Sequence, residues 1–81
     1  KVKYSSFARK HLKKLPKNAQ FKVVKKIRQL KVDPFLGKKL RGDFKSQRSF
    51  KAWPYRIIYH YLPKEKLLFI DIIEHKQQVY K

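Results

Sequence analysis

The chain has 81 residues, of which 23 are lysine or arginine and 5 are aspartate or glutamate, so its formal net charge is +18. A chain this short supports one hydrophobic core, and we expect a single domain over residues 1–81. It has no cysteine, which excludes disulfides and thiolate metal sites, and it has no apolar run near the roughly 18 residues of a membrane span. Such a charge attracts polyanions, so we expect nucleic acid first, then an acidic protein, then anionic lipid; the alternative is a solvated surface without a specific partner.

The sequence opens with a short strand and a helix. Residues 1–5 alternate around Val2 and Tyr4, which favours a strand. Ser5 or Ser6 can then cap a helix, whose inward positions follow helical spacing: Ala8, His11, Leu12 and Leu15.

A second helix follows directly. Pro16 ends the first helix and suits the first turn of the next. We expect the second helix to run to about Lys31 and to stop at Asp33-Pro34. Its inward positions are predicted to be Val23, Val24, Ile27 and Leu30.

The second half of the sequence favours strands. Aromatic and β-branched residues fill 48–53 and 55–62, and residues 67–73 follow a turn at 63–66. The last segment is almost wholly apolar except for Asp71, which predicts a strand buried on both faces. The order β-α-α-β-β-β predicts an α+β fold, a small and mostly antiparallel sheet with a helical hairpin packed on one face. The other face stays partly open and is the candidate for function.

A basic segment connects the two halves. Between Gly37 and Lys51 we expect an RNA-binding loop that contacts phosphates; the alternative is a merely solvated loop. Strand alternation places Ser49 and Lys51 on one face and puts Arg48 and Phe50 on the other. The predicted RNA-binding residues are Lys38, Lys39, Arg41, Lys45 and Arg48.

Arg56 interrupts an otherwise aromatic and β-branched strand. An arginine in a strand that packs is costly to desolvate unless it faces water or an anion. Alternation puts Arg56 on one face with Ile58 and His60, beside Lys51 after the Trp53-Pro54 corner. We expect a phosphate site there. The alternative is an ion pair with Asp71 or Glu74 that holds the strands together.

The tail from His75 to Tyr80 is rich in proton donors and cations. Tyr80 offers a phenol that acts as a general base where cations stabilise the phenolate, and His75 can give a proton to a leaving oxygen. Lys76 or Arg56 can stabilise negative charge on a phosphodiester in its transition state. The plainer interpretations are an aromatic lid for Tyr80 and a surface histidine for His75. The histidines are scattered and the acids form no cluster, so we expect neither a metal site nor a cofactor.

These motifs together resemble the RelE/ParE superfamily, the toxin halves of bacterial and archaeal toxin–antitoxin pairs. The resemblance spans nearly the whole chain and includes the predicted element order. Its motifs are Lys39-Leu40-Arg41-Gly42, then Arg48-Ser49-Phe50-Lys51 with Tyr55-Arg56-Ile57-Ile58-Tyr59, and finally Ile73-Glu74-His75-Lys76-Gln77-Gln78-Val79-Tyr80.

The resemblance implies a compact toxin that, like RelE-type members, cuts messenger RNA in the ribosomal A site. In the mechanism of those members, the ribose 2′-oxygen attacks the adjacent phosphate without a metal. Carried over by position, Arg56 contacts the scissile phosphate, Lys51 and Lys76 stabilise charge, and Tyr80 is the base. The implied partners are the ribosome, messenger RNA and an acidic antitoxin with a disordered segment, with operator DNA reached only through the antitoxin complex. A monomer in the cytoplasm, away from membranes, is expected for the toxin alone.

The sequence also departs from the pattern of RelE-type toxins. Gln47 and Ser49 stand where strongly active members can carry lysines, and Lys76 replaces an arginine and its bidentate fork. Glu74 replaces a glycine and adds an opposing charge. These departures leave open a ParE-like DNA gyrase inhibitor, which shares the fold, or a non-catalytic basic protein that binds the ribosome or RNA.

Overall fold

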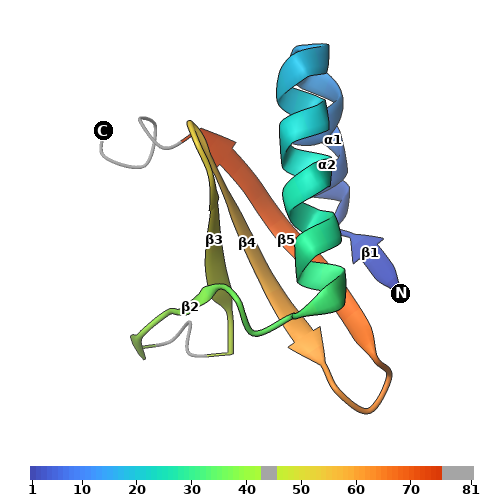
Figure 1. The fold of residues 1–81 in the computed structure, drawn as a ribbon, viewed down its shortest axis with the longest axis vertical. Coiled ribbons are helices and arrows are strands. Elements are labelled where there is room, and N and C mark those ends of the chain that lie inside the picture. Colours follow the sequence, from blue (N-terminus) through green and yellow to red (C-terminus); the bar gives the residue numbers. More distant parts are fainter. Residues whose placement is uncertain (43–45, 76–81) are drawn as a thin grey trace.

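The computed structural model describes residues 1–42 and 46–75 and has seven regular elements (Figure 1). In chain order they are β1 (Val2–Tyr4), α1 (Ser6–Lys14), α2 (Lys17–Val32), β2 (Lys38–Lys39), β3 (Arg48–Ala52), β4 (Tyr55–Leu62) and β5 (Leu67–His75). The predicted α+β class and the order β-α-α-β-β-β are confirmed, with β2 as an addition. No helix in the described part of the chain is long and apolar enough to cross a membrane.

Ser5 links the start of α1 to the sheet. Its hydroxyl oxygen accepts a 2.9 Å hydrogen bond from the backbone nitrogen of Ala8, as expected for a helix N-cap, and donates a 2.7 Å bond to the carbonyl of Asp71. The Ser5 backbone nitrogen also donates to the carbonyl of Ile70, at 2.9 Å. The predicted cap at Ser5 is therefore confirmed, and it fixes the entry of α1 against β5.

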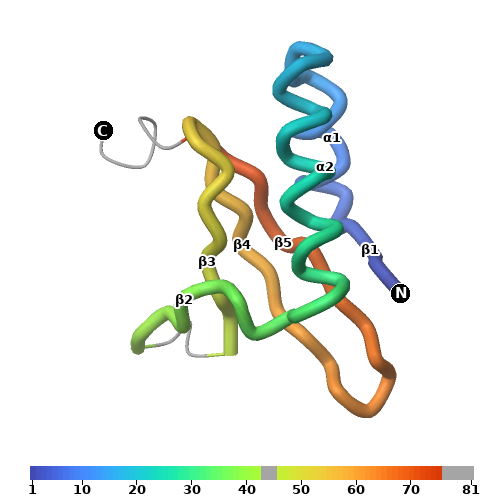
Figure 2. The backbone as a smooth tube through the Cα atoms, viewed as in Figure 1, coloured from blue at the N-terminus to red at the C-terminus, as the bar shows by residue number. Residues whose placement is uncertain are grey.

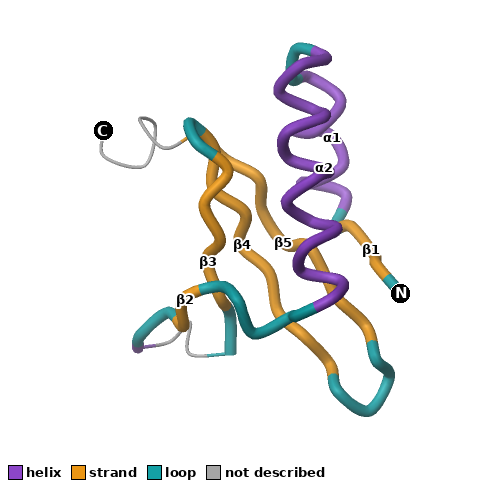
Figure 3. The backbone as a smooth tube through the Cα atoms, viewed as in Figure 1, coloured by secondary structure: helices purple, strands orange, loops and turns teal. Residues whose placement is uncertain are grey.

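The strands form one sheet in the order β1-β5-β4-β3-β2, in which β1 runs parallel to β5 and the other neighbours are antiparallel. Figure 2 shows β1 and β5, from the two ends of the described chain, running side by side. Both helices lie on one side of the sheet (Figure 3). The core between these layers is apolar, and its largest fully buried side chains are Tyr59, Leu30, Ile57, Ile70, Ile73 and Val23.

Strand β5 differs from its prediction. Its buried positions Leu68, Ile70 and Ile73 face the helices, whereas Phe69 and Ile72 between them are only partly buried. The expectation of burial on both faces is therefore wrong, because the helical hairpin covers one face and leaves Phe69 and Ile72 on the other only partly buried. A β-bulge at Asp71, which the β4–β5 register skips, separates the two halves of the strand.

Strand β2 was predicted as loop. It has only two residues, both lysine, and it exists because it pairs with Ser49 and Arg48 of β3. The buried hydroxyl of Tyr59 fixes its start, since it accepts a hydrogen bond from the Gly37 backbone nitrogen at 2.9 Å and donates to the Pro34 carbonyl at 2.7 Å. This contact sets where the basic segment lies relative to the sheet.

Candidate nucleic-acid interface

Lys51, Arg56 and Glu74 form a row across β3, β4 and β5 on the face of the sheet opposite the helices. Lys51 pairs with Arg56, and Arg56 pairs with Glu74. Their neighbours Ala52, Ile57 and Ile73 are buried against the helices, so alternation turns this row toward the open face. Lys51 is exposed and the other two are half-buried. The predicted proximity of Lys51 and Arg56 is confirmed, and their two cations lie beside one acidic side chain.

The basic segment divides between the two faces of the sheet. Lys38 pairs with Ser49 and shares its open face, whereas Lys39 pairs with Arg48 on the helix-facing side. Both lysines are exposed, as is Arg41. Lys45 lies outside the described residues. Of the predicted RNA-binding residues, Lys38 is therefore the one whose strand position matches that of Lys51 and Arg56.

Arg48 contacts the chain itself. Its Nη1 donates to the carbonyls of Gly37, at 2.8 Å, and of Phe35, at 3.3 Å, and its guanidinium lies 5.1 Å from the centre of the Phe35 ring. The side chain thus ties the segment after α2 to β3. This placement on the helix-facing side separates Arg48 from Lys51 and Arg56, and it favours a role in packing over phosphate contact.

His75 also faces the helices. It pairs with Tyr55, with ring centroids 5.3 Å apart in an edge-on arrangement, and both rings line a hollow of about 320 Å³ beside His11. Glu74, not His75, stands on the same side as Arg56. His75 therefore lies on the opposite face of the sheet from Lys51 and Arg56. Its predicted role as a proton donor beside Arg56 required the same face. The remaining predicted catalytic residues, Lys76 and Tyr80, lie outside the described residues.

A polar group on the open face was missed by the sequence analysis. Nδ1 of His60 lies 2.7 Å from Oδ2 of Asp71, and Nε2 of Gln47 donates to the same oxygen at 3.0 Å. The His60 ring also stacks on Phe69. The signal was present, because alternation placed His60 on the face of Arg56 and Asp71 was the single polar residue of an apolar strand.

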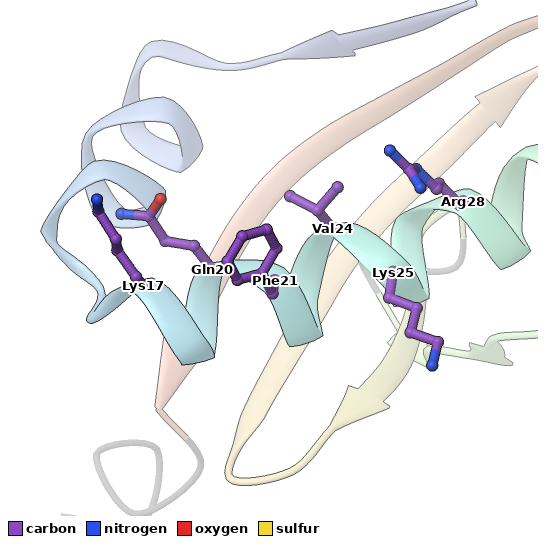
Figure 4. A pocket seen from close by; sticks show the side chains of 6 residues that line it. All are labelled: Lys17, Gln20, Phe21, Val24, Lys25 and Arg28. Carbon is purple, nitrogen blue, oxygen red and sulfur yellow. The ribbon is translucent and has the colours of Figure 1, made fainter.

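The outer side of α2 has a second surface with an apolar centre. Phe21 and Val24 lie along it, and the side chains that flank them are basic or polar: Lys17, Gln20, Lys25 and Arg28 (Figure 4). Phe21 is 75% exposed, which is unusual for a large apolar side chain. Val24 was predicted to point inward, but it is only partly buried because it lies on this outer side of α2 beside Phe21. Such an apolar strip with a basic border is a candidate surface for a partner.

The described residues offer no metal centre. In residues 1–42 and 46–75, no three His, Asp or Glu side chains come together in a group that could hold an ion. The chemistry available on the open face is therefore that of cations, an imidazole and carboxylates.

The chain was compared with protein-family models, curated proteins and solved structures. Residues 2–80 match the family model described as the ParE toxin of the type II toxin–antitoxin system parDE. No curated protein matches the chain.

Among solved structures, a chain of the RelBE2 toxin–antitoxin complex from Mycobacterium tuberculosis is 28% identical, with a TM-score of 0.84, and the match covers 91% of this chain and 94% of that one. The YoeB/ParE toxin from Agrobacterium tumefaciens shares the fold at 18% identity, with a TM-score of 0.82 and coverage of 93% and 96%. The isolated RelE toxin from E. coli does so at 21% identity, with a TM-score of 0.83 and coverage of 98% and 88%. The chain therefore belongs to the ParE toxin family of type II toxin–antitoxin systems, within the RelE/ParE superfamily.

Proposed function

We propose that this toxin is an endoribonuclease that cleaves messenger RNA on the ribosome, by attack of a ribose 2′-oxygen on the adjacent phosphate. The observation that carries the proposal is the cross-strand pair of Lys51 and Arg56 on the open face of a chain with a net charge of +18. Phosphate backbones bind to such surfaces.

Arg56 is the proposed contact of the scissile phosphate. Its planar guanidinium suits bidentate binding of two phosphate oxygens. Lys51, directly opposite on β3, adds a second positive charge where negative charge develops in the transition state. Glu74 on the other side of Arg56 opposes this field, so the site is weaker in charge than a purely cationic one.

Proton transfer is proposed for the tail. Tyr80 is the proposed base that takes the 2′-hydroxyl proton, and Lys76 is the proposed second stabiliser of charge; both roles come from the resemblance to RelE-type toxins. The orientation of His75 toward Tyr55 and α1 favours a positioning role for this residue rather than the role of acid. The proposed mechanism needs no metal ion, since these side chains supply both the charge stabilisation and the base, and a water molecule protonates the leaving 5′-oxygen.

The proposal is tested by primer extension on a translated message with purified toxin, in Mg²⁺ sufficient to keep ribosomes intact and with a chelator selective for transition metals. We expect new 5′ ends at codon positions on ribosome-bound message, and none on free RNA. Loss of cleavage with the chelator would refute the metal-independent mechanism, and absence of cleavage on ribosomes would refute the proposal itself.

The second candidate function is inhibition of DNA gyrase, and the matched ParE family model favours it. A supercoiling assay with purified gyrase separates the two candidates. Inhibition of supercoiling by a toxin that leaves ribosome-bound message intact would replace the ribonuclease by the gyrase inhibitor.

We further propose an acidic antitoxin as the natural partner. Three observations support it: the toxin family, the solved toxin–antitoxin complexes of similar fold, and the basic border around Phe21 and Val24 on α2. An antitoxin segment that folds on binding would place apolar side chains on this strip and acidic ones on its border. Co-elution of the neighbouring gene product in size-exclusion chromatography tests the partner. A toxin that elutes as a monomer in its presence would contradict it.

The proposed ribosomal target implies a cytoplasmic toxin.

A further inference from the structure

Two aromatic rings stack on the open face of the sheet, toward the other end of β4 from Arg56. His60 and Phe69 are cross-strand partners whose ring centroids are 5.1 Å apart, with an angle of 28° between the ring planes. Both side chains are only half-buried. On the far side of Phe69, the exposed Lys3 is its partner on β1. A stacked pair of rings at a sheet surface, next to a cation, offers a platform for another flat ring.

Hydrogen bonds hold the platform in one orientation. Because the Asp71 carboxylate can only accept, Nδ1 of the His60 imidazole carries a hydrogen and donates it to that carboxylate over 2.7 Å. Gln47 donates to the same carboxylate oxygen from the β3 side, at 3.0 Å. With Nδ1 engaged, Nε2 is the nitrogen that remains for a ligand. The ring therefore needs little reorganisation to bind.

The platform is too far from Arg56 to act on the same phosphodiester. Four residues along β4 separate His60 from Arg56, which corresponds to about 13 Å at ~3.3 Å per residue. A stacked nucleic-acid strand advances about 3.4 Å per nucleotide, so this distance spans about four stacked nucleotides, and fewer when the strand is extended. Half-buried Ile72 and buried Ile58 lie between the two ends, and the one charged group between them among the described residues of β4 and β5 is the Asp71 carboxylate, which is engaged by His60 and Gln47.

We propose that His60 and Phe69, with His60 held by Asp71 and Gln47, form a nucleobase-binding site for single-stranded RNA. An unpaired base extends the His60–Phe69 stack, and the RNA backbone runs along β4 to the cations at Lys51 and Arg56. This inference rests on the proposed ribonuclease function and adds to it a contact that sets the register of the RNA. Because every base has a flat face, the site contributes affinity and positioning rather than strict base identity.

Binding of a 2′-O-methyl RNA oligonucleotide, which cannot be cleaved by 2′-oxygen attack, tests the site by fluorescence anisotropy. Phe69→Leu keeps an apolar side chain and removes the ring, and Phe7→Leu is the matched control, since Phe7 is an exposed phenylalanine of α1. We expect Phe69→Leu to weaken binding about tenfold, Phe69→Tyr to restore it, and Phe7→Leu to leave it unchanged. The slope of log K against log salt should stay constant, because no charge is removed.

An abasic scan of the same oligonucleotide locates the bound base. One position should weaken binding to the wild type and have little effect on binding to Phe69→Leu, since the two changes remove the same contact. A flat scan, or equal losses for Phe69→Leu and Phe7→Leu, would overturn the proposal. So would a Phe69→Leu variant that binds RNA normally but binds the antitoxin weakly, which would mark a protein interface.

Two further measurements complete the test: binding of a DNA oligonucleotide and cleavage of ribosome-bound message. The same sequence as DNA identifies the ligand: tighter binding of RNA supports the proposal, and tighter binding of DNA by the wild type overturns it in favour of a DNA ligand. Cleavage of ribosome-bound message by the wild type is scored separately. The ribonuclease proposal fails when no cleavage occurs, whereas the base site fails when the abasic scan is flat, so the two failures are distinguishable.

Discussion

The hydroxyl group of Tyr59 lies 2.9 Å from the backbone nitrogen of Gly37, and this contact connects the centre of the core to the start of the basic segment. Tyr59 itself is fully buried. Through Gly37 and its neighbour Lys38, the position of the exposed cations depends on a hydrogen bond made inside the core. Stability and the proposed RNA-binding surface are therefore linked at this residue.

Tyr59→Phe should lower the free energy of unfolding by about 1–3 kcal/mol, because it leaves the Gly37 nitrogen and the Pro34 carbonyl without their buried partner. Urea unfolding measures this change. Tyr61→Phe is the control, since among the described residues the structure gives the Tyr61 hydroxyl no hydrogen bond. Equal stability of the two variants would show that the Tyr59 hydrogen bonds contribute nothing.

The same tyrosine should give stability a specific alkaline dependence. Burial raises the pKa of Tyr59 above its ordinary value of 10.0, although the Gly37 hydrogen bond and Arg48 oppose the shift. A raised pKa in the folded state means that this contribution is fully present below about pH 10 and is lost as the pH rises through the folded pKa. Tyr59→Phe should therefore lose less stability between pH 9 and pH 11 than the wild type. Parallel losses in thermal melts over that range would contradict this account.

The two glycines of the basic segment should respond to alanine for different reasons. A Cβ at Gly37 would meet the Tyr59 hydroxyl oxygen at 2.5 Å, so Gly37→Ala should cost about 1–3 kcal/mol through overpacking. Gly42 has open space around it but a φ of +70°, so Gly42→Ala should cost about 1–2 kcal/mol through backbone strain. Asparagine tolerates that conformation, so Gly42→Asn should recover part of the loss in urea unfolding, whereas Gly37→Asn should not. Similar losses for both asparagine variants would refute the distinction.

The basic residues should differ in their effect on RNA binding. Lys38→Ala should reduce the slope of log K against log salt by about 0.7, the value for one phosphate contact on a single strand. Arg48→Ala should lower thermal stability and leave that slope almost unchanged, because its guanidinium is held by the Gly37 and Phe35 carbonyls. A salt titration of both variants measures the slopes, with Lys64→Ala in the β4–β5 turn as a charge-matched control. Equal slope changes for Lys38→Ala and Arg48→Ala would show that Arg48 also contacts phosphate.

Strand alternation predicted the faces of β3 and β4 correctly, because the period of two is a local property of the pleat. Lys51 beside Arg56, and His60 on the same side, followed from it. The Ser5 cap and the stop at Asp33 were equally local. These features needed no knowledge of how distant segments pair.

The features that the sequence did not reveal depend on pairing between distant segments. Strand β2 consists of two lysines with no strand signal of their own, and it forms through its register with β3. The bulge at Asp71 belongs to the β4–β5 register, and it brings that carboxylate to His60. Arg48 was predicted to contact phosphate because it is one of several cations in a basic segment. Its carbonyl partners come from the segment after α2, which packs beside β3 only in the folded chain.

The most direct test of the central claim is single-turnover cleavage of ribosome-bound message by the wild type, Arg56→Ala and Lys64→Ala, with RNA binding measured in parallel. Arg56→Ala should lower the cleavage rate about 10²- to 10³-fold, as expected for removal of a group that stabilises transition-state charge, and should weaken RNA binding far less. Lys64→Ala should behave as the wild type, and urea unfolding should confirm that both variants are folded. Cleavage by Arg56→Ala at the wild-type rate, or equal losses of binding and cleavage, would contradict the role of Arg56 at the scissile phosphate.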